Sequence, residues 1–174
     1  MKIVSIFAPK LYSFRFPSEE LNELHRLLDN WNDVTYIYNF LKENKSDIDK
    51  NKNILELADQ ISDDAYEIEK TLYELSNNSS KSLEQFFKPL NNEEYYFQLL
   101  SRQKGRVNYL RIYALKIDEN CFVITGGAIK LTQRMQDREH TQKELYKINQ
   151  CKQFLTENGV HDSDSFYEFI TEQQ

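Results

Sequence analysis

The sequence predicts an α+β fold with N-terminal strands and helices, then a three-stranded antiparallel meander, then C-terminal helices. Two changes of pattern indicate this order. Between residues 18 and 75, apolar side chains recur every three or four positions, as they do on helices that pack against a core. Between residues 95 and 127, the apolar runs are short and rich in β-branched and aromatic residues, which favours strands. The 174 residues suffice for a single domain, 1–174, with one sizeable core.

The N-terminal part, residues 1–80, is predicted to be mainly helical after a short β-region. KIVSIF and LYSFRF alternate on either side of Pro9, which fits two short strands or a hairpin. Ser18 is expected to cap a first helix that runs through Trp31. A second helix is expected over Val34–Glu43, followed by a polar loop. A long amphipathic helix is expected from Ile54 to Leu75.

The second half contains the predicted sheet. YYFQLL, VNYLRIYALKI and CFVITGG are the three expected strands, and Asp118-Glu119-Asn120 is a hairpin loop between the last two. A helical pattern returns after Thr132 and ends at Asn158-Gly159. A last short helix, Ser165 to Ile170, is expected with Ser163 or Asp164 as its cap.

Charge is distributed unevenly along the chain. The net charge is −6, but residues 1–101 carry 11 Lys/Arg against 18 Asp/Glu, residues 102–152 carry 11 against 5, and residues 153–174 carry 0 against 5. A basic segment between acidic ones indicates either an anionic partner or electrostatic docking within the chain, unless the charges are simply solvated. The acidic stretch 56–74 raises the hypothesis that this helix covers the basic segment and competes with an anionic partner for its side chains. The alternative is that its carboxylates face water.

Several classes of site and location are not expected. No apolar run reaches the roughly 18 residues that span a bilayer, and the N-terminus is read as a strand, not a signal peptide. A cytoplasmic location is therefore predicted. Cys121 and Cys151 lack CxxC spacing and are expected to be buried thiols. His25 and His161 have no partners at ligand spacing, so no metal and no cofactor are expected.

Residues 84–150 resemble the RelE/HigB toxin superfamily, nearest its phage Gp49-like branch. The resemblance rests on LRIYALKIDENCFVITGGAIKLTQRMQ and the polar helix that follows. Arg111 and Tyr113 match the family's Arg-x-Tyr strand, Asp118 to Asn120 its acidic turn, and Gly126-Gly127 its small-residue step. Lys130 and Thr132 match its basic segment, although the paired lysines and the later proline typical of that branch are missing. A RelE-like fold is the expectation.

The resemblance implies a bacterial toxin–antitoxin toxin that acts as a metal-independent mRNA interferase. Such an endoribonuclease positions the 2′-hydroxyl, stabilises charge on the phosphate and moves protons. Its partners would be RNA, with ribosome dependence left open, and an antitoxin protein. The implied catalytic residues are Arg111, Lys130, Arg134 and His140. The implied RNA-binding residues are Tyr113, Arg106, Lys116, Thr132 and Arg138, while Gly126 and Gly127 would let RNA or a partner backbone approach.

Each residue also has an ordinary interpretation. Arg111 could be an exposed strand arginine, Tyr113 a packing residue, His140 a residue at a helix start, and the glycine pair a β-bulge. Two other functions therefore stay open. One is a non-catalytic protein-interaction module on a RelE-like scaffold, and the other is a small regulator derived from a phage or mobile element. If the cations gather on one concave face, RNA binding is favoured; if they are dispersed, protein interaction is favoured.

Overall fold

The computed structural model describes residues 1–7, 9–77, 82–91, 94–97, 107–132 and 138–173. The strands are β1 Lys2–Phe7, β2 Leu11–Arg15, β3 Phe87–Asn91, β4 Glu94–Phe97, β5 Leu110–Asp118 and β6 Cys121–Ile129. The α-helices are α1 Glu23–Asn32, α2 Val34–Glu43, α3 Ile54–Asn77, α4 Glu139–Glu157 and α5 Ser163–Glu172. Two short 3₁₀ turns, Lys45–Asp47 and Leu83–Gln85, precede α3 and β3. The fold is α+β.

One six-stranded mixed sheet has the order β1-β2-β6-β5-β4-β3. The two N-terminal strands pair antiparallel, with Ile3 opposite Phe14. Strand β2 then lies parallel to β6, with Tyr12 opposite Val123, so the N-terminus extends the same sheet as the later strands. Strands β3 to β6 are antiparallel neighbours in sequence order. The sheet is thus wider than the three strands expected, because the alternating pattern predicts a strand but not its partner.

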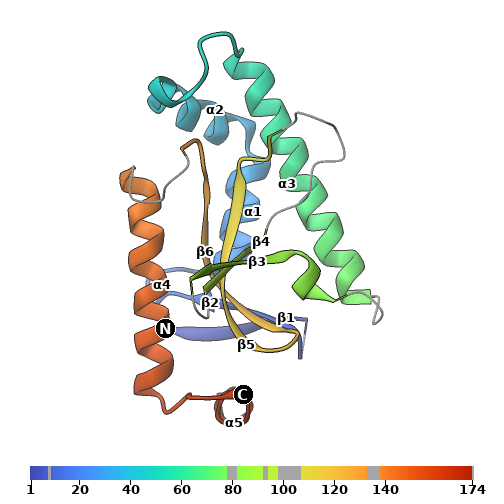
Figure 1. The fold of residues 1–174 in the computed structure, drawn as a ribbon, viewed down its shortest axis with the longest axis vertical. Coiled ribbons are helices and arrows are strands. Elements are labelled where there is room, and N and C mark those ends of the chain that lie inside the picture. The colour runs from blue at the N-terminus through green and yellow to red at the C-terminus, as the bar shows by residue number, and fades with distance from the viewer. Residues whose placement is uncertain (8, 78–81, 92–93, 98–106, 133–137, 174) are drawn as a thin grey trace.

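Helices cover both faces of this sheet (Figure 1). Helices α1, α2 and α3 bury one hydrophobic cluster against Leu110, Ile112 and Ile124. Helices α4 and α5 bury a second cluster against Tyr113 and Val123. All nine residues of β6 are buried, because helices lie over both of its faces, and its sequence accordingly reads as an almost unbroken apolar run.

Most helix boundaries agree with the sequence prediction. Helix α2 has the predicted limits, and the Asp33 side chain caps it by accepting the Thr35 and Tyr36 N–H groups. The predicted cap at Ser18 is wrong. Helix α1 begins at Glu23 because Asn22 accepts the His25 N–H at 3.1 Å. Helix α5 likewise begins at Ser163, capped by Asp162 and not by Ser163 or Asp164.

No helix in the described part of the chain is long and apolar enough to cross a membrane.

Candidate functional site

Arg111 and Tyr113 share one face of β5, as their spacing predicts. The Arg111 guanidinium lies 5.5 Å from the centre of the Tyr96 ring. Its Nη1 donates to the carbonyl oxygens of Asn108 and Leu110, each at 2.8 Å. Burial lowers the pKa of Arg111, and the neighbouring tyrosines oppose this shift. The side chain is therefore held by the protein's own backbone.

Tyr113 is 1% exposed and belongs to the cluster beneath α4. The predicted role of its ring as a stacking platform for RNA bases does not fit this placement, because no face of the ring is open to solvent. Burial raises the pKa of Tyr113, and its hydroxyl has no hydrogen-bond partner among the described residues.

The other predicted cations lie elsewhere. Lys116 donates to Glu84 at 2.5 Å and lies 5.7 Å from the centre of the Tyr95 ring. Arg138 immediately precedes α4, and its Nε donates to Asp47 at 2.6 Å. This hydrogen bond lowers the pKa of Asp47. Lys116 and Arg138 thus both bind carboxylates from the N-terminal half of the chain.

The remaining candidates lie at or beyond the end of β6. The Lys130 N–H donates to the Tyr109 carbonyl at 2.7 Å, and Lys130 and Thr132 are partly buried. His140, in the first turn of α4, has its Nε2 3.2 Å from the Ile129 carbonyl and packs edge-on against Phe40. Burial lowers the pKa of His140, which favours the neutral ring. Arg106 and Arg134 lie outside the described residues.

The glycine pair serves internal packing. A Cβ on Gly126 would lie 2.0 Å from Glu144 Oε2, and one on Gly127 would lie 2.6 Å from the Arg111 carbonyl and 2.7 Å from Leu27 Cδ1. Helix α4 therefore packs closely against the backbone of Gly126, and helix α1 against that of Gly127. The expectation that RNA or a partner backbone approaches Gly126 and Gly127 is corrected, because the chain's own side chains occupy that space.

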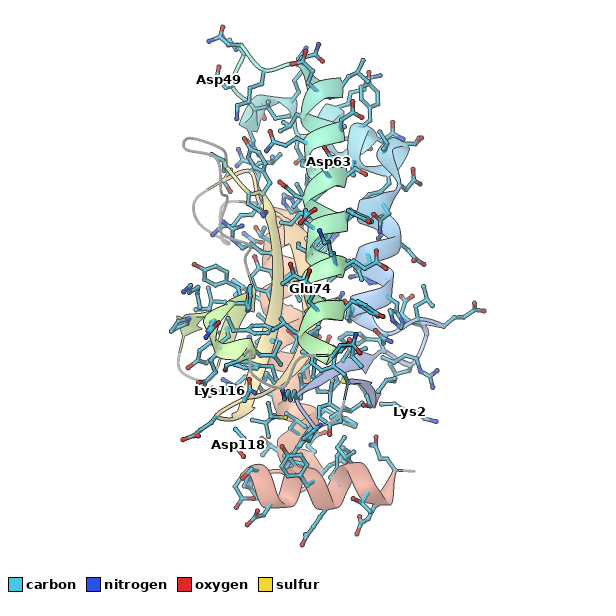
Figure 2. All side chains as sticks on the ribbon, turned by 90° about the vertical axis from the view of Figure 1, so that its right-hand side faces the viewer. Lys2, Asp49, Asp63, Glu74, Lys116 and Asp118 are labelled. Carbon is cyan, nitrogen blue, oxygen red and sulfur yellow. The ribbon has the colours of Figure 1, made fainter. Side chains whose placement is uncertain are left out.

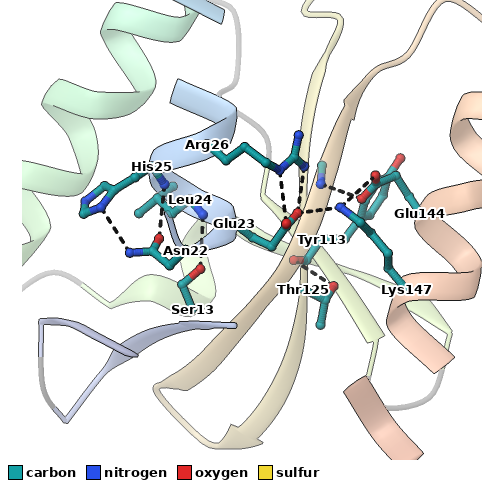
Figure 3. A network of polar contacts seen from close by, with 11 residues as sticks. Ser13, Asn22, Glu23, Leu24, His25, Arg26, Tyr113, Thr125, Glu144 and Lys147 are labelled. Carbon is teal, nitrogen blue, oxygen red and sulfur yellow. Dashed lines mark hydrogen bonds and ion pairs between the residues drawn. The ribbon is translucent and has the colours of Figure 1, made fainter. Parts of the chain in front are cut away.

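Sequence reasoning missed a buried ionic cluster formed by Glu23, Arg26, Glu144 and Lys147 (Figure 3). Arg26 forms two hydrogen bonds with Glu23, at 2.7 and 3.1 Å. Lys147 Nζ lies 2.7 Å from Glu23 and 3.6 Å from Glu144. Glu23 comes from α1 and Lys147 from α4, so the cluster links two helices through residues that lie 124 positions apart in the sequence.

Glu144 connects this cluster to the sheet. Its Oε2 accepts the Gly127 N–H at 2.8 Å. The pairing of β2 with β6 ends at Ser13 and Ile124, so the Gly127 N–H lies beyond the last paired residue of β6 on this side. Burial raises the pKa of Glu144 to about 6, while Lys147 opposes the shift and Glu23 adds to it.

A sequence signal for the cluster existed. Glu23 and Arg26, and also Glu144 and Lys147, are three residues apart on their helices. Glu144 also precedes Ile148 and Cys151 on the buried stripe of α4. A carboxylate within an apolar stripe indicates a buried partner, but the sequence does not say which helix provides it.

A groove of about 420 Å³ lies between the end of β5, helix α4 and the segment 160–162 that precedes α5. Leu115, Ile117, Leu155 and Val160 provide its apolar lining. Its two lysines already bind carboxylates, since Lys116 contacts Glu84 and Lys152 Nζ lies 3.2 Å from Glu94. Among the residues that the structure describes, no group of three or more His, Cys, Asp or Glu side chains could hold a metal ion.

Comparisons with protein-family models, with curated proteins and with solved structures give no match.

Proposed function

We propose that the chain is a non-catalytic protein-interaction module. One observation carries the proposal: cations of the basic segment, residues 102–152, are bound by carboxylates that precede this segment in the sequence, between residues 23 and 94. The ion pairs are Lys116–Glu84, Arg138–Asp47, Lys147–Glu23 and Lys152–Glu94. This fits the alternative in which the uneven charge serves docking within the chain.

An mRNA interferase needs cations that reach the scissile phosphate and change their interactions in the transition state. Here Arg111 donates to backbone carbonyls, while Lys116 and Arg138 neutralise partners in other elements. Moving these side chains onto RNA would leave Glu84 and the largely buried Asp47 carboxylate without them. Arg111, Lys116 and Arg138 thus already bind groups of the chain itself, which favours protein interaction over RNA cleavage.

The proposal keeps a RelE-like scaffold as its structural framework. Support comes from the order of N-terminal strands, helices, consecutive antiparallel strands and a closing helix. In this proposal the chain works in the cytoplasm, and its partner is another protein, for example an antitoxin.

Regulated expression in bacteria tests the choice between the two functions. We expect wild type and Arg111→Ala to give equal growth, and the purified wild-type protein to leave RNA uncut. Growth arrest together with RNA cleavage, both lost in Arg111→Ala, would overturn the proposal and establish the interferase.

A second measurement asks what the surface contacts. Photo-crosslinking side chains placed at exposed positions, such as Tyr73 in α3, should give adducts that protease removes and ribonuclease leaves intact. Adducts sensitive to ribonuclease, or no protein adduct at any exposed position, contradict a protein-interaction role.

A further inference from the structure

Helix α3 uses one face for the core and leaves the other uncovered by any described element. Its inner face buries Leu57, Ile61, Ile68 and further apolar residues against α1, α2 and β5. Figure 2 looks onto the outside of α3, where Asp63 and Glu74 are labelled. The inner contacts anchor α3 in the core, and its exposed outer residues are available for another role.

Large side chains follow a line along this outer face. Leu55 is 59% exposed, Tyr66 62% and Tyr73 72%. They are separated by about three and two helical turns, so they lie one above another over about 27 Å. Exposed single apolar residues are common, but three in register form a strip, and tyrosine is enriched in protein interfaces.

Carboxylates flank this strip in an arrangement that costs stability. Asp59, Asp63 and Glu67 are exposed and follow one another at four-residue spacing. Like charges at this spacing destabilise a helix by a few tenths of a kcal/mol per pair. No ion pair among the described residues involves these three, and Lys70 is the one basic residue of α3. Unfavourable like-charge spacing that no ion pair offsets is typical of a functional surface.

We propose that the outer face of α3, formed by Leu55, Asp59, Asp63, Tyr66, Glu67 and Tyr73, binds an arginine-rich segment of a partner protein. The inference rests on the proposed function and specifies its surface and partner chemistry. A guanidinium can bind carboxylates through two parallel hydrogen bonds and stack on a tyrosine ring, so arginine matches both components of the face.

Other occupants fit less well. Nucleic acids and anionic lipid surfaces carry negative charge and would be repelled. A second copy of this chain, related by two-fold symmetry, would place the same acidic face against itself. A lysine-rich segment would satisfy the charge but would lack the planar group that pairs with a carboxylate and stacks on a ring.

The test uses a helical peptide of five Ala-Ala-Ala-Arg repeats and its lysine and glutamine counterparts, with binding to the full chain followed by fluorescence anisotropy. We expect the arginine peptide to bind more tightly than the lysine peptide of equal charge, and the glutamine peptide not to bind. Binding should weaken as salt is added.

Matched variants locate the binding face. Asp63→Lys with Glu67→Lys should weaken arginine-peptide binding about tenfold or more, because two attractions become repulsions. The control is Asp164→Lys with Glu168→Lys, which makes the same charge change at the same spacing on the exposed side of α5. This control should leave the affinity within about twofold of wild type.

Tyr66→Ala with Tyr73→Ala should lower the affinity for the arginine peptide about fivefold and remove the preference for arginine over lysine. Tyr146→Ala, at an exposed tyrosine on α4, should have no effect.

Circular dichroism and thermal unfolding must show that every variant folds. Equal loss in both charge-reversal pairs, or equal affinity for the arginine and lysine peptides, overturns the α3 surface while leaving a protein-interaction role intact. Cleavage of RNA that depends on Arg111 overturns the proposed function itself, so the two failures are distinguishable.

Discussion

At the scale of single residues, Glu144 is a carboxyl group whose burial disfavours its charged form. Burial raises its pKa from 4.5 to about 6, so the folded protein binds a proton more readily than the unfolded chain does. The resulting stabilisation is fully present below about pH 4.5 and is lost as the pH rises through about 6. A shift of this size corresponds to about 2 kcal/mol.

Glu144→Gln tests this linkage. The amide oxygen can still accept the Gly127 N–H, but the side chain no longer titrates. Wild type should therefore gain about 2 kcal/mol relative to the variant when urea unfolding is measured at pH 4.5 instead of pH 7. Glu139→Gln, at an exposed position of the same helix, is the control and should show almost no such gain. A pH-independent difference between wild type and Glu144→Gln would show that Glu144 keeps an ordinary pKa.

Gly127→Ala tests the packing role of the glycine pair. The new Cβ would lie 2.6 Å from the Arg111 carbonyl, and neighbouring backbone cannot move as easily as a side chain. We expect a loss of about 3 kcal/mol in the free energy of unfolding. Gly159→Ala is a useful comparison, since nothing lies within 4 Å and only its φ of +76° disfavours a side chain. That variant should lose about 1 kcal/mol. A loss at Gly127 no larger than the loss at Gly159 would contradict the packing role of Gly127.

At the scale of elements, the buried ionic cluster joins α1 and α4 beside β6. Glu23 is 1% exposed and binds both Arg26 and Lys147, so Glu23→Gln would leave two cations facing an amide. Breaking a buried pair from one side is strongly destabilising, and we expect about 3 kcal/mol by chemical denaturation. Adding Lys147→Met should recover part of the loss, because it removes one unpaired charge. Additive losses in this double-mutant cycle would show that the two residues are not coupled.

The contacts of helix α3 differ from those expected if this acidic helix covered the basic segment. Glu23, Asp47, Glu84 and Glu94, which neutralise the basic segment, all lie outside α3. Within the acidic stretch of α3, Asp64 is 8% exposed, while Asp63 and Glu67 face outward. The exposed pair contacts no described cation of the basic segment, so the interpretation in which these carboxylates face water fits better.

At the scale of the whole molecule, the two cysteines report on the packing of the α4 and α5 layer against the sheet. Cys121 lies in β6 and Cys151 in α4, and both are free and buried. Burial raises the pKa of Cys121 to about 11 and raises that of Cys151 further above its usual value, so neither forms a thiolate at neutral pH. A thiol reagent should label neither cysteine in the native protein and both in denaturant. Rapid native labelling of either would contradict the packing of α4 and α5 on the sheet.

The amino-acid sequence by itself determined the elements whose signal is local. Helix α2, the start of α3 at Ile54, and the strands around the Asp118 turn follow from periodicity and turn chemistry, which act over a few residues. The burial of both cysteines confirms the prediction made from their lack of CxxC spacing.

Only the tertiary structure decided which distant residues meet. It placed β2 beside β6, brought Glu23 against Lys147, and put Glu144 where a side chain on Gly126 would have been. It also turned Arg111 toward carbonyls and buried Tyr113, although their spacing predicted a shared face correctly. Spacing along a strand gives the side on which a residue lies. Whether that side faces solvent, a ligand or another helix depends on long-range packing, which no local pattern encodes.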